Sequence, residues 1–277
     1  MLAGLELDIT FTPEDFRRIR DMVYQRVGIA LNDSKTHMAY ARLAKRVRAL
    51  SLKSFAEYLD RLDQDALSEE WQNFINALTT NLTSFFREPH HFDMLRAHAE
   101  RWRKRGRPYR VWSAASSTGE EPYSIAITMA ELTESLRPFP CELLASDIDT
   151  HVLQQAMRGV YLRERVSQLS EPQLRRFFDK GVGANEGKVR LKKRVREAMT
   201  FFQMNLVAEE WPPLGEFDVI FCRNVLIYFD KPTQAAILNH MARHLAPDGL
   251  LLLGHSENIL HLSDAFVPCG KTSYRLA

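Results

Sequence analysis

The spacing of apolar residues changes once along the chain, and this change divides the chain into two parts. In about the first 80 residues, apolar positions such as Phe16, Ile19 and Val23 recur every three or four residues, as on one face of a helix. From about residue 108, short apolar runs alternate with helical patterns. The sequence therefore predicts a helical N-terminal part followed by an α/β part.

Three helices are predicted in the first part. The first begins after Thr12, which can form a capping box with Asp15, and it ends at Gly28. The second spans residues 35–50, and the third includes residues 71–78; each has one apolar stripe. We expect the helical domain to cover residues 1–80, with a linker over 81–107.

Four apolar runs in the second part have the length of buried strands: 111–115, 143–146, 217–222 and 250–254. Helical patterns lie between them, at 121–135, 149–158 and 232–245. This alternation is typical of an α/β domain with a mostly parallel sheet covered on both faces, here over residues 108–277. Residues 272–276 add a possible antiparallel edge strand.

Residues 178–202 interrupt the alternation. The glycine-rich stretch GVGANEG indicates a hairpin, and after it Val189 and Leu191 alternate with basic residues. These basic residues are Lys188, Arg190, Lys192 and Arg194. The pattern predicts a small antiparallel β-subdomain, inserted in the α/β domain, with one apolar and one basic face.

Composition limits the kind of protein. The net charge of +2 over 277 residues means that any basic surface is local. Cys141, Cys222 and Cys269 are widely spaced, so neither a disulfide framework nor a zinc site is expected. The first 11 residues lack the pattern of a signal peptide, and no apolar run is long enough to span a membrane. We expect a soluble protein of a reducing compartment.

The turn after the first predicted strand, SAASSTGEE, lies where nucleotide-binding folds hold phosphates. It contains neither GxxxxGK[ST] nor GxGxxG, and Glu120 and Glu121 would repel a pyrophosphate. One interpretation is that the two carboxylates face a positively charged ligand. The other is that they only complement the positive end of a helix dipole, which is worth ~0.3–1 kcal/mol. Both interpretations remain open on this stretch alone.

Acidic and polar residues also follow the other strands. Asp147 ends the second strand, where an acid commonly holds ribose hydroxyls. A ligand with a ribose, no phosphates and positive charge fits both features, and S-adenosylmethionine is such a ligand. Arg223 follows the strand 217–222 directly, so its charge needs a partner. Tyr228 comes one turn later, as a site residue or as a core aromatic.

Five motifs, in order, resemble the chemotaxis receptor methyltransferases, the CheR family. They are NALTTNLTSFFRE, WSAASSTGEEPYSIAI, ASDIDT, FDVIFCRNVLIYFDK and LAPDGLLLLGHSEN, and the resemblance runs from about residue 11 to the C-terminus. It implies a helical domain, a Rossmann-like methyltransferase domain and an inserted β-subdomain. It also implies a cytoplasmic enzyme that transfers methyl groups from S-adenosylmethionine to receptor glutamates, giving methyl esters and S-adenosylhomocysteine.

The resemblance also implies site residues. The cofactor site would consist of Asn81, Thr83, Arg87, Glu121, Asp147, Asn205, Leu206, Asn224 and Val225, with no metal. Arg87, Arg223 and Tyr228 match positions that face the transferred methyl or the incoming carboxylate, and we expect them to orient these groups.

Two basic surfaces are candidates for receptor binding. Lys35, Arg42, Lys45 and Arg46 lie on one side of the second helix, either as a docking face for a receptor helix or as a solvated surface. In the β-subdomain, the resemblance implies that a C-terminal receptor pentapeptide, bound by part of the family, adds as a strand and pairs its carboxylates with Lys180 and Arg190. Basic residues there can also simply protect a sheet edge from pairing.

Two rival functions stay open. A methyltransferase of nucleic acid or of another protein is the first, although Asn224-Val225-Leu226-Ile227 lacks the Pro-Pro motif of amine-methylating relatives. A receptor-binding sensor that holds the cofactor without catalysis is the second, and Arg87 and Tyr228 favour an enzyme instead.

Overall fold

The computed structural model describes residues 9–102, 107–135 and 140–277. Residues 1–8, which carry most of the stretch judged not to be a signal peptide, lie outside this set. The chain divides into two compact units, residues 1–80 with 228–230, and residues 81–227 with 231–277. Within the described residues, no helix is both long and apolar enough to cross a membrane.

The first unit is helical. It contains α1 (Pro13–Val27), the 3-10 helix η1 (Asp33–Lys35), α2 (Thr36–Ala49), α3 (Phe55–Gln64) and α4 (Glu69–Leu78). The predicted capping box is confirmed, because Thr12 Oγ1 accepts the Asp15 N–H while the Asp15 carboxylate accepts the Thr12 N–H. Gly28 ends α1 with φ 70°, a left-handed conformation that suits glycine. The three predicted helices are present, and α3 was not predicted.

The second unit is built on a seven-stranded sheet with the order β6-β2-β1-β7-β8-β10-β9. The strands are β1 (Tyr109–Ser113), β2 (Cys141–Asp147), β6 (Met199–Gln203), β7 (Phe217–Cys222), β8 (Leu245–Leu253), β9 (Phe266–Gly270) and β10 (Ser273–Leu276). Strands β6, β2, β1, β7 and β8 are parallel, and β10 runs antiparallel to β8. The mostly parallel sheet is confirmed, but β10 is not an edge strand, because β9 pairs with its other side.

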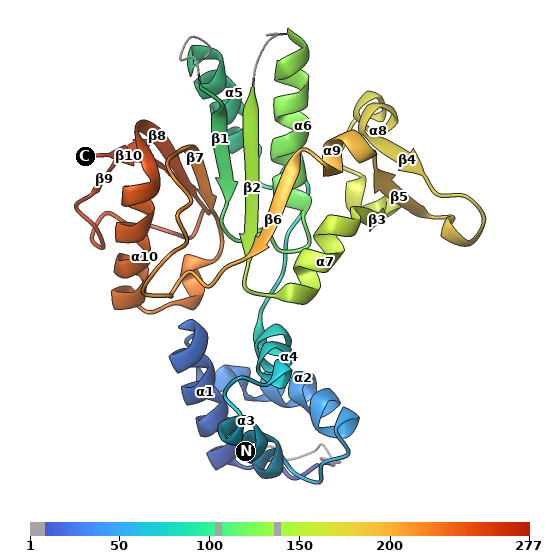
Figure 1. Cartoon of the computed structure of the whole chain (residues 1–277), viewed down its shortest axis with the longest axis vertical. Helices are drawn as coiled ribbons and strands as arrows, with labels where there is room; N and C mark the ends of the chain where they lie inside the picture. The colour runs from blue at the N-terminus through green and yellow to red at the C-terminus, as the bar shows by residue number, and fades with distance from the viewer. Residues whose placement is uncertain (1–8, 103–106, 136–139) are drawn as a thin grey trace. The chain divides into compact units, whose positions relative to one another are not determined.

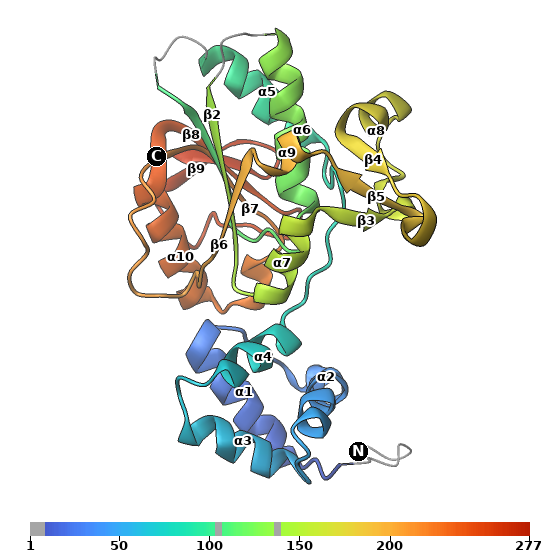
Figure 2. The same cartoon turned by 45° about the vertical axis from the view of Figure 1, so that its right-hand side comes forward.

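Helices cover both faces of this sheet. They are α5 (His90–Trp102), α6 (Glu120–Ser135), α7 (Thr150–Arg158) and α10 (Lys231–His244). Figures 1 and 2 show α6 and α7 on one face and α10 on the other. Every residue of β7 is buried, as the mostly apolar run FDVIFC predicts for a central parallel strand, and the buried Asp218 is paired with Arg107. The carboxyl ends of β1, β2 and β7 therefore meet at one edge of the sheet.

A small antiparallel sheet, with the order β3-β5-β4, lies beside this domain (Figure 1). It contains β3 (Val160–Leu162), β4 (Phe178–Lys180) and β5 (Lys188–Leu191), with the helices η2 (Arg163–Val166), α8 (Glu171–Phe177), η3 (Gly183–Asn185) and α9 (Lys193–Arg196) around it. The alternation on β5 is as predicted, with Val189 and Leu191 buried and Lys188 and Arg190 exposed.

The expected limits of this insertion, 178–202, were wrong at both ends. Strand β3 joins the small sheet from before residue 178, because it pairs with β5. Residues 199–203 instead form β6, which pairs in parallel with β2 in the large sheet. The apolar side chain of Phe201 explains the placement, since its ring packs 5.7 Å from Tyr123 of α6. Arg194 also lies in α9 and not on the basic strand.

Candidate active site

The turn after β1 is shaped by backbone conformation and close packing. Ser117 and Gly119 have φ of 49° and 98°. A Cβ at Gly119 would lie 2.7 Å from Tyr161 Oη and 2.8 Å from Ala156 Cβ, so only glycine fits. The Ser117 N–H donates to Asp147 Oδ2 at 2.8 Å, which ties the turn to the end of β2.

Asp147 and Asn81 come together through this turn. Asp147 Oδ1 accepts the N–H of Asp149 at 3.0 Å, and Asp149 Oδ2 accepts from Asn81 Nδ2 at 2.9 Å. Ser117 Oγ donates to the Asn81 carbonyl at 3.0 Å. Burial raises the pKa of Asp147 to about 6, although the N–H groups of Asp149 and Ser117 oppose the shift. Asp147 is therefore a buried acid whose charge is held by backbone donors.

Asn205 and Leu206 lie next to the same strand end. They follow β6, and the Met204 N–H donates to the Asp147 carbonyl at 3.0 Å. Asn205 Oδ1 accepts the Val207 N–H at 3.2 Å, which holds a tight turn, and Leu206 is buried. Two of the predicted cofactor residues are thus anchored beside a third.

The two glutamates of the turn have different partners, so they do more than complement a helix dipole. Glu120 is 1% exposed and forms an ion pair with Arg165 of η2, which also donates to the Thr83 carbonyl at 2.9 Å. Glu121 accepts from Ser113 Oγ through one oxygen and from Arg223 Nη1 through the other, both at 2.8 Å. Burial raises the pKa of Glu121, and the charge of Arg223 opposes this.

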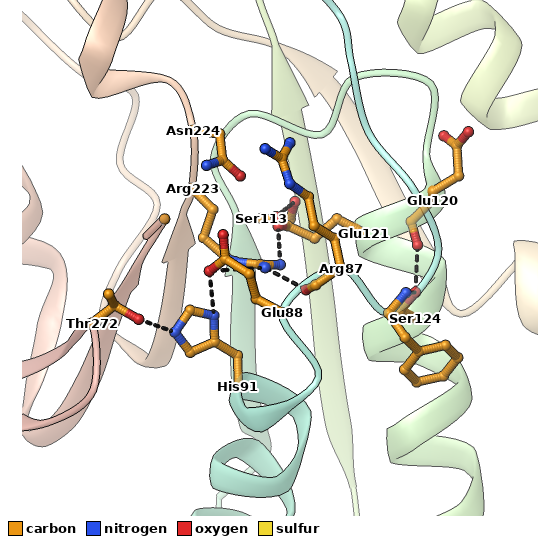
Figure 3. Close-up of polar contacts among 12 residues, drawn as sticks. Arg87, Glu88, His91, Ser113, Glu120, Glu121, Ser124, Arg223, Asn224 and Thr272 are labelled. Atoms are coloured by element: carbon orange, nitrogen blue, oxygen red, sulfur yellow. Dashed lines mark hydrogen bonds and ion pairs between the residues drawn. The ribbon is translucent and has the colours of Figure 1, made fainter. Parts of the chain in front are cut away.

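Arg223 faces protein groups on several sides (Figure 3). Its side chain is 1% exposed. Besides its bond to Glu121, it donates to the Arg87 carbonyl, and its Nη2 lies 3.4 Å from Glu88 Oε2. The guanidinium of Arg223 is therefore held by protein groups, Glu121, Glu88 and the Arg87 carbonyl. These contacts favour a supporting role for Arg223 over the predicted direct contact with the methyl group or the substrate carboxylate.

Arg87 is positioned by an unusual backbone. Its neighbours Phe86 and Glu88 have φ of 50° and 56°, a left-handed conformation that is costly for non-glycine residues. Ser124 Oγ accepts the Phe86 N–H at 2.9 Å, and the Arg87 guanidinium donates to the Leu82 carbonyl at 3.0 Å. In Figure 3 the Arg87 side chain points away from Glu88 and His91, while its carbonyl faces Arg223.

The loop after β7 carries Asn224 and Val225, and one distant carboxylate holds it. Glu257 accepts the N–H groups of Asn224, Val225 and Leu226 at 2.8–2.9 Å, and that of Gly254 at 2.6 Å. Asn224 has φ 59°, and a Cβ at Gly254 would lie 2.2 Å from its Nδ2. Sequence reasoning missed Glu257, although the quoted GHSEN motif contains it.

Tyr228 is assigned to the first compact unit, and the site residues described above belong to the second. It lies at the end of the 3-10 helix η4 (Leu226–Tyr228), in the segment 228–230 that belongs to the first unit. Its carbonyl accepts the Ala30 N–H at 2.9 Å. Tyr228 is thus not among the residues that the second unit brings together.

The predicted docking cations divide into two kinds. Arg46 of α2 makes two hydrogen bonds to the Glu70 carboxylate, at 2.9 and 2.6 Å, and Arg42 donates to the carbonyls of Ala77 and Thr79. Lys35 and Lys45 are exposed. Of these four residues, the two lysines are exposed and the two arginines join α2 to α4.

The chemistry of the site suits a cationic ligand with a ribose. Asp147 and Glu121 place carboxylates at the carboxyl edge of the sheet, where α/β folds bind ligands. In the turn between them, the fully buried Ser116 Oγ makes no hydrogen bond with the described residues, so it is an available polar atom. This arrangement fits S-adenosylmethionine and disfavours a pyrophosphate.

Comparison with known proteins agrees with this chemistry. Residues 14–79 match the all-alpha domain of the CheR methyltransferases, and residues 81–275 match their SAM binding domain. Chemotaxis protein methyltransferase 2 of Pseudomonas aeruginosa is 51% identical over 264 residues, covering 95% of this chain and 93% of the relative. The chemotaxis protein methyltransferase of Escherichia coli is 50% identical over 277 residues, covering 100% and 96%.

The sheet, the acidic edge and these matches define an S-adenosylmethionine-dependent methyltransferase with a Rossmann-like fold. More particularly, the chain belongs to the CheR methyltransferase family, and its cofactor is S-adenosylmethionine. Members of this family methylate chemotaxis receptors, and the chain is a chemotaxis methyltransferase.

Proposed function

We propose that the protein is a cytoplasmic protein-glutamate O-methyltransferase, which converts glutamate side chains of chemotaxis receptors to methyl esters and leaves S-adenosylhomocysteine. The observation that carries the proposal is the pairing of Glu121 with Arg223 directly behind Arg87. It joins a buried acid, suited to a cationic cofactor, to the backbone of Arg87, whose partly exposed side chain is proposed to receive a carboxylate.

Different residues of the second unit bind different parts of the cofactor. Asp147 holds the ribose hydroxyls, and Glu121 faces the ammonium group of the cofactor's amino-acid part. Asn205, Leu206, Asn224 and Val225 border the site from two anchored loops, with Asn81 and Thr83 at the start of the unit. When bound, the cofactor supplies a methyl group on a positively charged sulfur.

No general base is needed for this reaction. A glutamate carboxylate has a reference pKa near ~4.3, so it is already ionised at pH 7. Arg87 orients it, and Tyr228 is proposed to act with Arg87 once the substrate is bound. In-line placement of two reactants can contribute roughly 7–11 kcal/mol to lowering the barrier. The enzyme therefore works mainly by alignment.

Receptor binding is proposed at two places. The exposed Lys35 and Lys45 attract an acidic receptor helix, while Arg42 and Arg46 fix the helix that carries one of these lysines. In the small sheet, Lys180 and Arg190 are exposed on the edge strand β4 and on β5. They are suited to pair with the carboxylates of a receptor C-terminal pentapeptide that adds as a strand.

The test is methyl transfer from tritiated S-adenosylmethionine to receptor-containing membranes, followed by base treatment. Methyl esters release volatile methanol in base, so base-labile counts on the receptor support the proposal. Base-stable counts on protein or nucleic acid would indicate amine or base methylation instead. Binding of the cofactor without any transfer to receptors would indicate a sensor.

A further inference from the structure

Behind Arg87, a chain of buried polar side chains runs from β1 to the turn before β10 (Figure 3). Ser113 bonds to Glu121, and Glu121 pairs with Arg223. Arg223 Nη2 lies 3.4 Å from Glu88 Oε2, and this oxygen lies 3.6 Å from His91 Nδ1. His91 Nε2 and Thr272 Oγ1 are 2.8 Å apart. Glu88 and His91 thus extend the Glu121–Arg223 pair into a larger network, and the proposed mechanism gives neither of them a role.

In this network, two carboxylates face one cationic side chain. One guanidinium, Arg223, lies between two carboxylates, Glu88 and Glu121. The only other titratable side chain in the chain just described is His91, which is fully buried, and burial lowers its pKa to about 3. His91 is therefore neutral at pH 7, so Arg223 is the only cation among the side chains just named.

A metal ion is a poor candidate for a second cation beside Glu88 and Glu121. Glu88, His90 and His91 do offer ligand atoms within 4.8 Å of one another. The same Glu88 oxygen already faces Arg223, however, and a cation there would be repelled by the guanidinium. The oxygen therefore has a positive partner in the protein itself.

We propose that Glu88 is a positioning residue that shares Arg223 with Glu121, so that Glu121 keeps part of its negative charge for a cationic ligand. Without Glu88, the guanidinium would neutralise Glu121 fully. The retained negative charge attracts the ammonium group of either ligand, and it attracts the sulfur only in S-adenosylmethionine, where the sulfur is positive, so it favours S-adenosylmethionine over S-adenosylhomocysteine. The inference rests on the proposed role of Glu121 in holding the cofactor.

Calorimetry with the two ligands separately tests the proposal. Glu88→Gln keeps the size of the side chain and an acceptor for the His255 N–H, which Glu88 Oε1 accepts at 3.2 Å. We expect it to weaken S-adenosylmethionine about tenfold more than S-adenosylhomocysteine, because it removes one unit of negative charge from the cluster and only S-adenosylmethionine carries a positive sulfur. Equal loss for both ligands, or no loss, would overturn the proposal.

Matched variants separate this effect from general damage. Glu142→Gln removes the same charge from an exposed residue at the start of β2, paired with Arg110, and should leave the ratio of the two affinities unchanged. Glu88→Asp keeps the charge, so the ratio should stay within about threefold of that of the unmodified protein. Glu88→Asp also keeps the proposal testable if Glu88→Gln does not fold. A folded Glu88→Asp protein whose affinity ratio for the two ligands differs from that of the unmodified protein by much more than threefold would refute the proposal that Glu88 and Glu121 share Arg223.

The role of Glu121 is checked in the same experiment. Glu121→Gln should weaken both ligands, because both carry the same ammonium group. If both affinities stay unchanged, the proposed role of Glu121 fails, and the inference about Glu88 fails with it. If both fall while Glu88→Gln leaves the ratio unchanged, only the inference about Glu88 fails.

Discussion

Glu257 Oε2 accepts the backbone N–H of Asn224 at 2.8 Å, across 33 residues of sequence. The same carboxylate accepts three more N–H groups, from Val225, Leu226 and Gly254. The loop that carries two proposed cofactor residues is therefore shaped by a side chain from beyond the next strand. Burial raises the pKa of Glu257, and these four donors oppose that shift, so the carboxylate needs them all.

Glu257→Gln should weaken S-adenosylmethionine binding by ~1–3 kcal/mol, because an amide nitrogen would face two of the four donors and leave them unsatisfied. Calorimetry measures the affinity, and thermal unfolding shows whether the fold is kept. Glu216→Gln, an exposed residue before β7, removes the same charge and should have no effect. Undiminished affinity in a folded Glu257→Gln protein would separate this loop from the cofactor site.

Cofactor binding should weaken in acid because of Asp147. Burial raises the pKa of its carboxyl to about 6, so the free protein protonates Asp147 as the pH falls through that value. If the cofactor binds the ionised form, its affinity should fall up to tenfold for each pH unit below about 6. Asp147→Asn should bind more weakly at pH 7.5 and lose this dependence between pH 5 and 7. A slope that persists in the variant would have another origin.

Charge reversal at the end of η1 and on α2 should separate docking from folding. Lys35→Glu with Lys45→Glu should slow receptor methylation several-fold, most at low salt, and leave cofactor binding alone, because exposed charges act on encounter. Initial rates at two salt concentrations measure this. Rates that do not change would leave the basic face without a docking role.

Arg46→Glu is the matched contrast on the same helix. It replaces the double hydrogen bond to Glu70 by two facing carboxylates, so the free energy of unfolding of the helical unit should fall by about 1–3 kcal/mol. Denaturant unfolding measures the loss. A fully stable Arg46→Glu protein would show that the pair does not hold α2 against α4.

The small sheet should bind a receptor C-terminal peptide with micromolar affinity if it acts as a tether. Arg190→Glu should abolish this binding, while Lys193→Glu, an exposed reversal on α9, should not. Titration of acidic, aromatic-ended peptides by calorimetry decides the question. Absence of binding by every such peptide would leave the basic residues as protection of an edge strand.

The spacing of apolar residues and the length of the apolar runs were enough to predict most of the fold. The run FDVIFC was predicted with correct limits, because a central parallel strand is apolar on both faces. The β6 strand was assigned to the wrong sheet, since the continuous stretch 188–203 alternates too weakly to show where one sheet ends. Its pairing with β2 is a long-range contact that local pattern does not encode.

Site residues were proposed from the sequence only at strand ends and within the motifs that carry the family resemblance. Asp147 was proposed as a cofactor residue because it ends a strand, where ligands bind, and Glu121 because it lies in a motif that resembles the family's. Glu88, His91 and Glu257 were missed, because their importance lies in partners distant in sequence, such as Arg223 and the loop at Asn224. Arg42 and Arg46 looked like surface charges for the same reason, since Glu70 and the end of α4 are on another helix.

The central claim is that the methyl group arrives on receptor glutamates as an ester, aligned by Arg87. Mass spectrometry of receptor peptides after reaction with S-adenosylmethionine tests it most directly, because it identifies the modified side chain. We predict methyl groups on glutamate side chains that disappear in mild base, and their strong reduction by Arg87→Ala with cofactor affinity measured alongside. Methylation of lysine, arginine or nucleic acid, or unmodified receptor glutamates under conditions in which the cofactor binds, would contradict the account.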